Sequence, residues 1–162
     1  MSSRTSSLRP IVVVALIQLL ASNLNAQTKA AWSDSLKLRY MRIRARSEGA
    51  CVLVSTSGSM DIEAHISPAN VRRWIDTATA YAAAKPHRAK GQRLRYAWIP
   101  STIGIDREIT DRFDAFSFVI AGHGIPIFAS EVPRIVKLLD SAAVNTLDRS
   151  GGKGACTLDP DR

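Results

Sequence analysis

The spacing of apolar residues along this chain changes twice from a period of two to a period of about 3.6. Alternation of apolar and polar residues is typical of half-buried strands, whereas spacings of three and four are typical of amphipathic helices. Each helical pattern follows a series of strand patterns. Strands in series with helices after them predict an α+β fold. We expect an antiparallel sheet of about six strands with two amphipathic helices on one face.

The first strand pattern shifts its phase by one residue. Apolar residues occupy even positions from Leu36 to Tyr40 and odd positions from Met41 to Ala45. A β-bulge near Tyr40 and Met41 would produce this shift, because one extra residue moves the following side chains to the other face. We therefore expect one long, bulged strand in this region.

Further strand patterns follow in both halves of the chain. Cys51–Val54 predicts a short buried strand, and Ser55–Ser59 predicts a polar hairpin loop before Met60–Ile66 alternates again. In the second half the strand patterns cover 94–98, 103–109, 116–120 and 125–128. The two halves together therefore contain enough strand signals for a sheet of about six strands.

Two serines mark the expected helix starts. Ser67 is expected to cap the first helix, with Pro68 at its first position. Ser130 is expected to cap the second helix, with Pro133 in the first turn, where a missing N–H group is tolerated. Both halves thus run from strands through a serine cap to a helix. A degenerate βββα duplication and the shared logic of amphipathic helices both explain the likeness.

The N-terminal segment has the features of a secretory signal peptide. Arg4 and Arg9 precede the apolar run Ile11–Ala21, which is shorter than the roughly 20 residues that span a bilayer. Leu24–Ala26 then supplies a small-residue cleavage site. We expect cleavage after Ala26 and a secreted or periplasmic protein; an uncleaved membrane anchor is the alternative.

This interpretation divides the chain into four parts. The expected parts are a signal peptide at 1–26, a loose lead-in at 27–35, a single α+β domain at 36–147 and a flexible tail at 148–162. Cys51 and Cys156 are the only cysteines. In an oxidising compartment two thiols usually pair, so we expect a disulfide that tethers the tail. Two free thiols are the alternative.

Basic residues provide the clearest candidate binding surface. The chain has 22 Lys and Arg against 14 Asp and Glu, and loss of Arg4 and Arg9 leaves 20 against 14, a net charge of +6. Arg42, Arg44 and Arg46 are expected on one strand face, about 6 to 7 Å apart. A second group lies in a stretch without acids, and its members are Lys85, Arg88, Lys90, Arg93 and Arg95. Arginine forks suit phosphate and carboxylate ligands, although a solvated face that prevents edge pairing is the alternative.

Residues that could support catalysis form a weaker pattern. The group from Asp106 to Asp114 contains four acids, and Asp106 and Glu108 are expected on one strand face. Intervening arginines favour ion pairs on a solvated face instead. The three histidines, His65, His87 and His123, lack metal-ligand spacing, so the sequence predicts neither a metal nor a cofactor site.

Two polar stretches fail to match known site motifs. Ser55–Ser59 lacks the glycines of a nucleophile elbow. Gly151–Gly154 lacks the spacing of a phosphate-binding loop. We therefore expect a non-catalytic binding or accessory module whose partner is an anionic polymer or an acidic protein. The alternative hypothesis is a secreted hydrolase that uses acids around Asp106 to Asp114 with a histidine.

Overall fold

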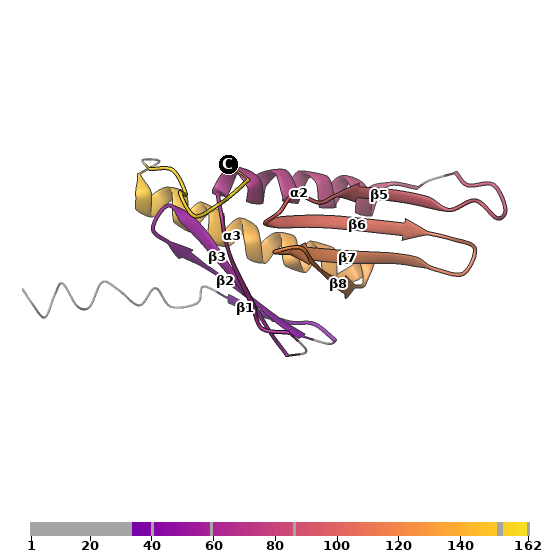
Figure 1. The fold of residues 1–162 in the computed structure, drawn as a ribbon, viewed down its shortest axis with the longest axis horizontal. Helices are drawn as coiled ribbons and strands as arrows, with labels where there is room; N and C mark the ends of the chain where they lie inside the picture. The colour runs from indigo at the N-terminus through magenta and orange to yellow at the C-terminus, as the bar shows by residue number, and fades with distance from the viewer. Residues whose placement is uncertain (1–33, 40, 59, 86, 152–153, 162) are drawn as a thin grey trace, which may run out of the picture. The chain divides into compact units, whose positions relative to one another are not determined.

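The computed structural model describes residues 34–39, 41–58, 60–85, 87–151 and 154–161 (Figure 1). The expected signal peptide and nearly all of the lead-in lie outside these residues. The elements, labelled as in Figure 1, are β1 (Asp34–Lys37), β2 (Met41–Glu48), β3 (Cys51–Gly58), β4 (Ile62–Ile66), α2 (Pro68–Ala83), β5 (Leu94–Trp98), β6 (Ile103–Ile109), β7 (Asp114–Ile120), β8 (His123–Ile127), the short 3-10 helix η1 (Ala129–Glu131) and α3 (Val132–Ser150).

The fold is α+β, but its strands form two sheets instead of the single expected one. Sheet A has the order β1-β2-β3-β4 and sheet B the order β5-β6-β7-β8, with every neighbouring pair antiparallel. Consecutive strands joined by short turns pair most easily with each other. The long helix α2 separates β4 from β5, so each half completes its own four-stranded sheet.

The expected β-bulge near Tyr40 is wrong, because the chain reverses there. The amide of Leu38 donates to the carbonyl of Met41 at 2.8 Å, and Leu36 pairs with Ile43 across two antiparallel strands. A two-residue hairpin turn also shifts the apolar phase by one residue, since the facing residues of both strands point to the same side of the sheet. The alternation therefore belongs to two strands, β1 and β2.

The Ser55–Ser59 stretch is mostly strand, which corrects the expected loop. Strand β3 continues to Gly58, and Ser55 and Thr56 are buried. The hydroxyl of Thr56 donates to the carbonyl of Met60 at 3.0 Å and accepts from the amide of Ile62 at 3.2 Å. These bonds satisfy a buried hydroxyl and close the β3–β4 hairpin after Gly58, which explains why polar residues are tolerated there.

The first helix starts as predicted, and the second does not. The Ser67 hydroxyl accepts from the amide of Asn70 at 3.2 Å, and Pro68 is the first helical residue. Ser130 instead lies in η1, where Glu131 accepts from the amide of Phe128 at 2.8 Å. Helix α3 continues to Ser150, beyond the expected end of the domain.

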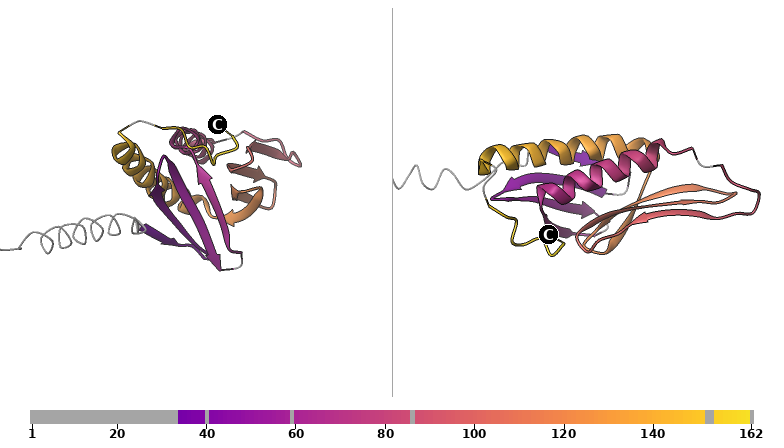
Figure 2. Two further views of the ribbon diagram at one scale, coloured as in Figure 1. Left: turned by 60° about the vertical axis from the view of Figure 1, so that its left-hand side comes forward. Right: turned by 90° about the horizontal axis from the view of Figure 1, so that it is seen from above.

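Each helix packs mainly against the sheet of the other half. Helix α2 follows sheet A but packs chiefly on β6 of sheet B, whereas α3 follows sheet B but packs on β1, β2 and β3 of sheet A. The helices also pack against each other (Figure 2). The expected placement of both helices on one face of one sheet is therefore corrected. One continuous core contains residues from both sheets and both helices.

The C-terminal segment is held by more than the disulfide. Cys51 and Cys156 are bonded as predicted. The carboxylate of Asp159, which is fully buried, accepts hydrogen bonds from the Ser67 amide at 2.6 Å and the Asn70 side chain at 2.9 Å. It also accepts from the Thr102 hydroxyl at 2.9 Å. The expected tail at 148–162 thus begins within α3 and ends docked beside the start of α2 (Figure 1).

Asp161 adds a second attachment to the β5–β6 turn. Its carboxylate accepts from the Ser101 amide at 3.1 Å and from the amide of Thr102 at 2.5 Å. Burial alone would raise the pKa of both carboxyls, but the hydrogen bonds outweigh it and hold the pKa values of Asp159 and Asp161 below their usual range. The tail therefore connects the two halves through ionised carboxylates.

Replacing Asp159 with asparagine is expected to lower the free energy of unfolding by about 1 to 3 kcal/mol, because buried donors lose their acceptor. A lowered folded pKa contributes stability above the unfolded pKa, and this contribution is lost as pH falls through the folded pKa. Urea unfolding across acidic pH should therefore show a flatter pH dependence in Asp159→Asn than in wild type. Identical pH profiles would contradict this role of Asp159.

Candidate functional site

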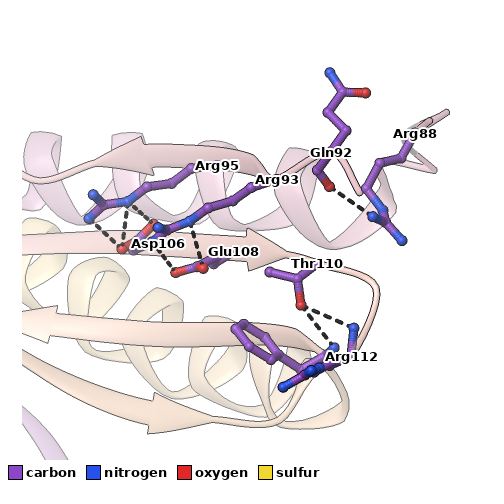
Figure 3. Close-up of polar contacts among 9 residues, drawn as sticks. Arg88, Gln92, Arg93, Arg95, Asp106, Glu108, Thr110 and Arg112 are labelled. Atoms are coloured by element: carbon purple, nitrogen blue, oxygen red, sulfur yellow. Dashed lines mark hydrogen bonds and ion pairs between the residues drawn. The ribbon is translucent and has the colours of Figure 1, made fainter. Parts of the chain in front are cut away.

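Two arginines of the second basic group lie beside two acids of the acidic group on the outer side of sheet B (Figure 3). The guanidinium of Arg95 on β5 binds Asp106 on β6, with nitrogen–oxygen distances of 2.7 to 3.1 Å. Arg93 binds Glu108 at 2.7 and 2.9 Å. In the strand register Arg95 lies opposite Glu108, and Ala97 lies opposite Asp106. Arg95 therefore reaches its partner Asp106 diagonally across the two strands. Two predicted binding arginines are therefore engaged with two predicted acids.

The next acid, Asp111, is also paired with an arginine, which lies in the loop before β5. Arg88 binds Asp111 at 2.5 Å, and the amide of Gly91 donates to the same carboxylate at 2.9 Å. The hydrogen bond from Arg88 lowers the pKa of Asp111, so this acid stays ionised at neutral pH. Of the loop's predicted cations, Lys85 and Lys90 are exposed and have no ion-pair partner among the described residues.

The fourth acid of the group lies against the inner face of sheet B. Asp114 binds the buried guanidinium of Arg107 at 2.7 and 2.9 Å, which lowers the pKa of Asp114. Arg107 also donates to the backbone carbonyls of Tyr81 and Ala84 at the end of α2. A cation at a helix C-terminus satisfies free carbonyls and suits the helix dipole. Arg107 and Asp114 thus have a structural role.

No hydrogen bond or ion pair joins a described histidine to these acids. Nε2 of His65 is 3.6 Å from Oε1 of Glu48 on sheet A. The side chain of His123 contacts the carbonyl of Ala121 in its own turn, and His87 is exposed in the loop before β5. The hydrolase hypothesis requires a histidine in contact with the acids around Asp106 to Asp114, and the described part of the chain contains no hydrogen bond or ion pair of this kind.

The first basic group forms a row on the outer face of β2, as its spacing predicts. Arg46 binds Glu48 at 2.9 Å, so this end of the row is neutralised. Arg44 is half-buried, and Arg42 is exposed at the other end. The strand register places Lys37 on one side of Arg42 and Ser57 on the other. Positive charge therefore concentrates at the β1–β2 turn.

A hollow of about 320 Å³ lies at this turn. Three cations line it, Lys37, Arg39 and Arg42, and its other described lining residues include no carboxylate. We call these three residues the β1–β2 basic cluster. The guanidinium of Arg39 also lies 5.7 Å from the centre of the Phe128 ring, a cation–π contact. The cluster can offer guanidinium and ammonium donors to a phosphate, sulfate or carboxylate group.

Lys37 and Arg39 were not among the candidates that the sequence identified. Interpreting 36–46 as one bulged strand kept these residues away from Arg42. The signal that could have found them is the two-residue turn: pairing Leu38 with Met41 places Lys37 directly opposite Arg42. The two predicted basic groups do not form one surface, since the loop lies at the end of sheet B away from sheet A (Figures 1 and 2).

Comparison with known proteins assigns no family to the chain. No protein-family model matches it, and no curated protein matches its sequence. Among the described residues, no group of three or more His, Cys, Asp or Glu side chains is placed to hold a metal ion. No helix in the described part of the chain is long and apolar enough to cross a membrane.

Proposed function

We propose that this protein is a non-catalytic binding or accessory module that binds an anionic polymer through the β1–β2 basic cluster. The observation that carries the proposal is a hollow whose described lining residues include three cations and no carboxylate. An acidic protein is the alternative partner, because its carboxylates offer the same chemistry. Arg44 and Arg46 extend the row along β2 but are half-buried, and Arg46 is paired with Glu48.

The loop before β5 supports such binding less well. Arg88, Arg93 and Arg95 each have a carboxylate partner, so an incoming anion would compete with Asp111, Glu108 and Asp106. Its exposed lysines, Lys85 and Lys90, carry the remaining charge. Exposed ion pairs add little free energy, so the acids weaken the loop as a binding surface by lowering its net positive potential and not through the strength of each pair.

We further propose that the protein is exported, because a signal-like segment precedes a domain closed by the Cys51–Cys156 disulfide. The repeated order of four strands and a helix supports descent of the two halves from one duplicated unit. Export would place the basic cluster among envelope or extracellular polymers, many of which are anionic.

Reversing the charges of the cluster tests the proposal. Lys37→Glu with Arg42→Glu should lose most of its retention on heparin at low salt, because the contact is electrostatic. The matched control is Lys85→Glu with Lys90→Glu, which changes the net charge equally at two exposed lysines. Retention on heparin and on a neutral polysaccharide is measured at low and high salt.

The proposal requires wild type and the loop variant to behave alike and to elute earlier as salt increases. Surface substitutions of this kind usually change stability by less than about 0.5 kcal/mol, so both variants should remain folded. Equal losses in both variants would show that net charge alone is measured. A larger loss in the loop variant would place the site at Lys85 and Lys90 instead.

A further inference from the structure

A second hollow, distinct from the basic cluster, lies between the two helices and the C-terminal segment. Its volume is about 610 Å³, within the range typical of small-molecule sites. Four segments distant in the sequence form its walls: the β2–β3 turn, the first turns of α2, the last turn of α3 and the segment around the disulfide. No motif in the sequence predicts this site.

The lining of this hollow is mostly apolar with few charges. Leu147, Ala69 and Ala155 contribute apolar surface, and Leu147 is 47% exposed although it lies on a packed helix. Among the described residues that line it, the charged side chains are Arg73 and Asp161. An apolar hollow with one or two charged groups is suited to a ligand that has an apolar body and one charged end.

The two charged residues are not equivalent. Both carboxylate oxygens of Asp161 accept hydrogen bonds from Ser101 and Thr102, and these bonds keep its pKa low despite burial. The guanidinium of Arg73 has no hydrogen bond or ion pair to another described residue. The guanidinium of Arg73 is therefore the charged group that can bind a ligand in this hollow. Because it is positive, the matching ligand group is an anion.

The walls are held in place before any ligand arrives. The disulfide fixes Cys156 to β3, while Asp159 and Asp161 fasten the end of the chain to α2 and to the β5–β6 turn. Pre-organised walls reduce the ordering that binding would otherwise require. We propose that this hollow is a second binding site, which takes a small amphipathic carboxylate with its apolar body against Leu147 and its carboxylate on Arg73.

The test uses three probes with the same eight-carbon chain: octanoate, 1-octanol and octylammonium. Binding to the oxidised, full-length protein is followed by NMR titration of backbone amides. We expect octanoate to bind with a roughly millimolar dissociation constant, as suits so small a ligand, and to shift the amides of Ala69, Arg73 and Leu147. Octanol should bind about tenfold more weakly, and octylammonium more weakly still.

Two variants and a matched control identify the residues involved. Arg73→Gln should weaken octanoate binding about tenfold, the change that one charge-assisted hydrogen bond supplies, and leave octanol binding unchanged. Ala69→Leu, which fills the hollow, should weaken both probes. Arg134→Gln removes another exposed arginine from the first turn of α3, outside the hollow, and should change neither.

Four results would overturn the proposal. These are no saturable octanoate binding, octanol or octylammonium binding as tightly as octanoate, an equal loss in Arg73→Gln and Arg134→Gln, and amide shifts located away from α2 and α3. Since the hollow shares no lining residue with the β1–β2 basic cluster, the double variant of Lys37 and Arg42 should bind octanoate normally. Failure of one site is thus distinguishable from failure of the other.

Discussion

Truncation of Trp74 to alanine is expected to lower the free energy of unfolding by about 3 to 5 kcal/mol. The side chain is fully buried and belongs to the half of the chain that precedes sheet B. Its ring packs edge-on against Phe118 with a centroid distance of 5.4 Å, and its indole N–H donates to the carbonyl of Gly104 at 2.8 Å. Truncation removes a large apolar volume and leaves a buried carbonyl without its donor.

Trp74→Phe separates these two contributions. It retains most of the packing against Phe118 and loses the hydrogen bond to Gly104, so we expect a smaller loss of about 1 to 3 kcal/mol. Urea unfolding is followed by circular dichroism. Because each helix packs on the other half's sheet, both variants should unfold in one transition. Two separate transitions, or a loss below about 1 kcal/mol for Trp74→Ala, would contradict the exchanged packing.

The disulfide is expected to contribute nearly as much to the free energy of unfolding as the Trp74 side chain. Cys51 and Cys156 are 105 residues apart, and a loop of this length corresponds to about 4.7 kcal/mol in the chain-entropy model. Replacing both cysteines with serine should therefore destabilise the protein by about 2 to 5 kcal/mol. The hydrogen bonds of Asp159 and Asp161 should keep the tail docked in the folded variant, since they do not depend on the sulfur atoms.

Reductant provides the control for the serine variant. Wild type in reductant should unfold at the urea concentration of the double variant, and the variant should not respond to reductant at all. Both comparisons use the same urea unfolding measurement. A double variant as stable as oxidised wild type would mean that this bond does not constrain the unfolded chain.

Local signals in the sequence predicted part of this fold correctly. The start of α2 follows from Ser67 and Pro68 alone, because capping depends only on neighbouring residues. The disulfide follows from two cysteines in a chain with a signal-like segment. The α+β class follows from the two changes in apolar period, since these reflect which faces are buried.

Features that depend on distant residues were not predictable in this way. A bulge and a two-residue turn shift the apolar phase in the same way. The pattern alone therefore fits one bulged strand, in which Lys37 lies far from Arg42, as well as it fits the two paired strands β1 and β2. Which sheet each helix covers depends on contacts across the whole chain, such as that of Trp74 with Phe118. The polar, glycine-rich tail suggested flexibility, and its docking depends on Asp159 and Asp161, whose partners lie about 60 to 90 residues away.

In the candidate site, too, local features were predictable from the sequence and long-range contacts were not. Spacing by two predicted that Arg42, Arg44 and Arg46 share a strand face, but it did not predict that Glu48 neutralises one end of the row. The acids around Asp106 were expected to form ion pairs on a solvated face as one interpretation, and each of the four binds an arginine. Their partners could be identified only once β5 and β6 were known to pair in this register.

Binding of an anionic polymer to the β1–β2 basic cluster is tested most directly by mapping where such a polymer contacts the protein. The measurement is an NMR titration of the oxidised protein with a short heparin-derived oligosaccharide at low salt. We expect the largest amide shifts at Lys37, Arg42 and Ser57, and we expect these shifts to be lost at high salt and in the Lys37→Glu, Arg42→Glu variant. Largest shifts at Lys85 and Lys90, or small shifts spread evenly over the surface, would contradict this expectation.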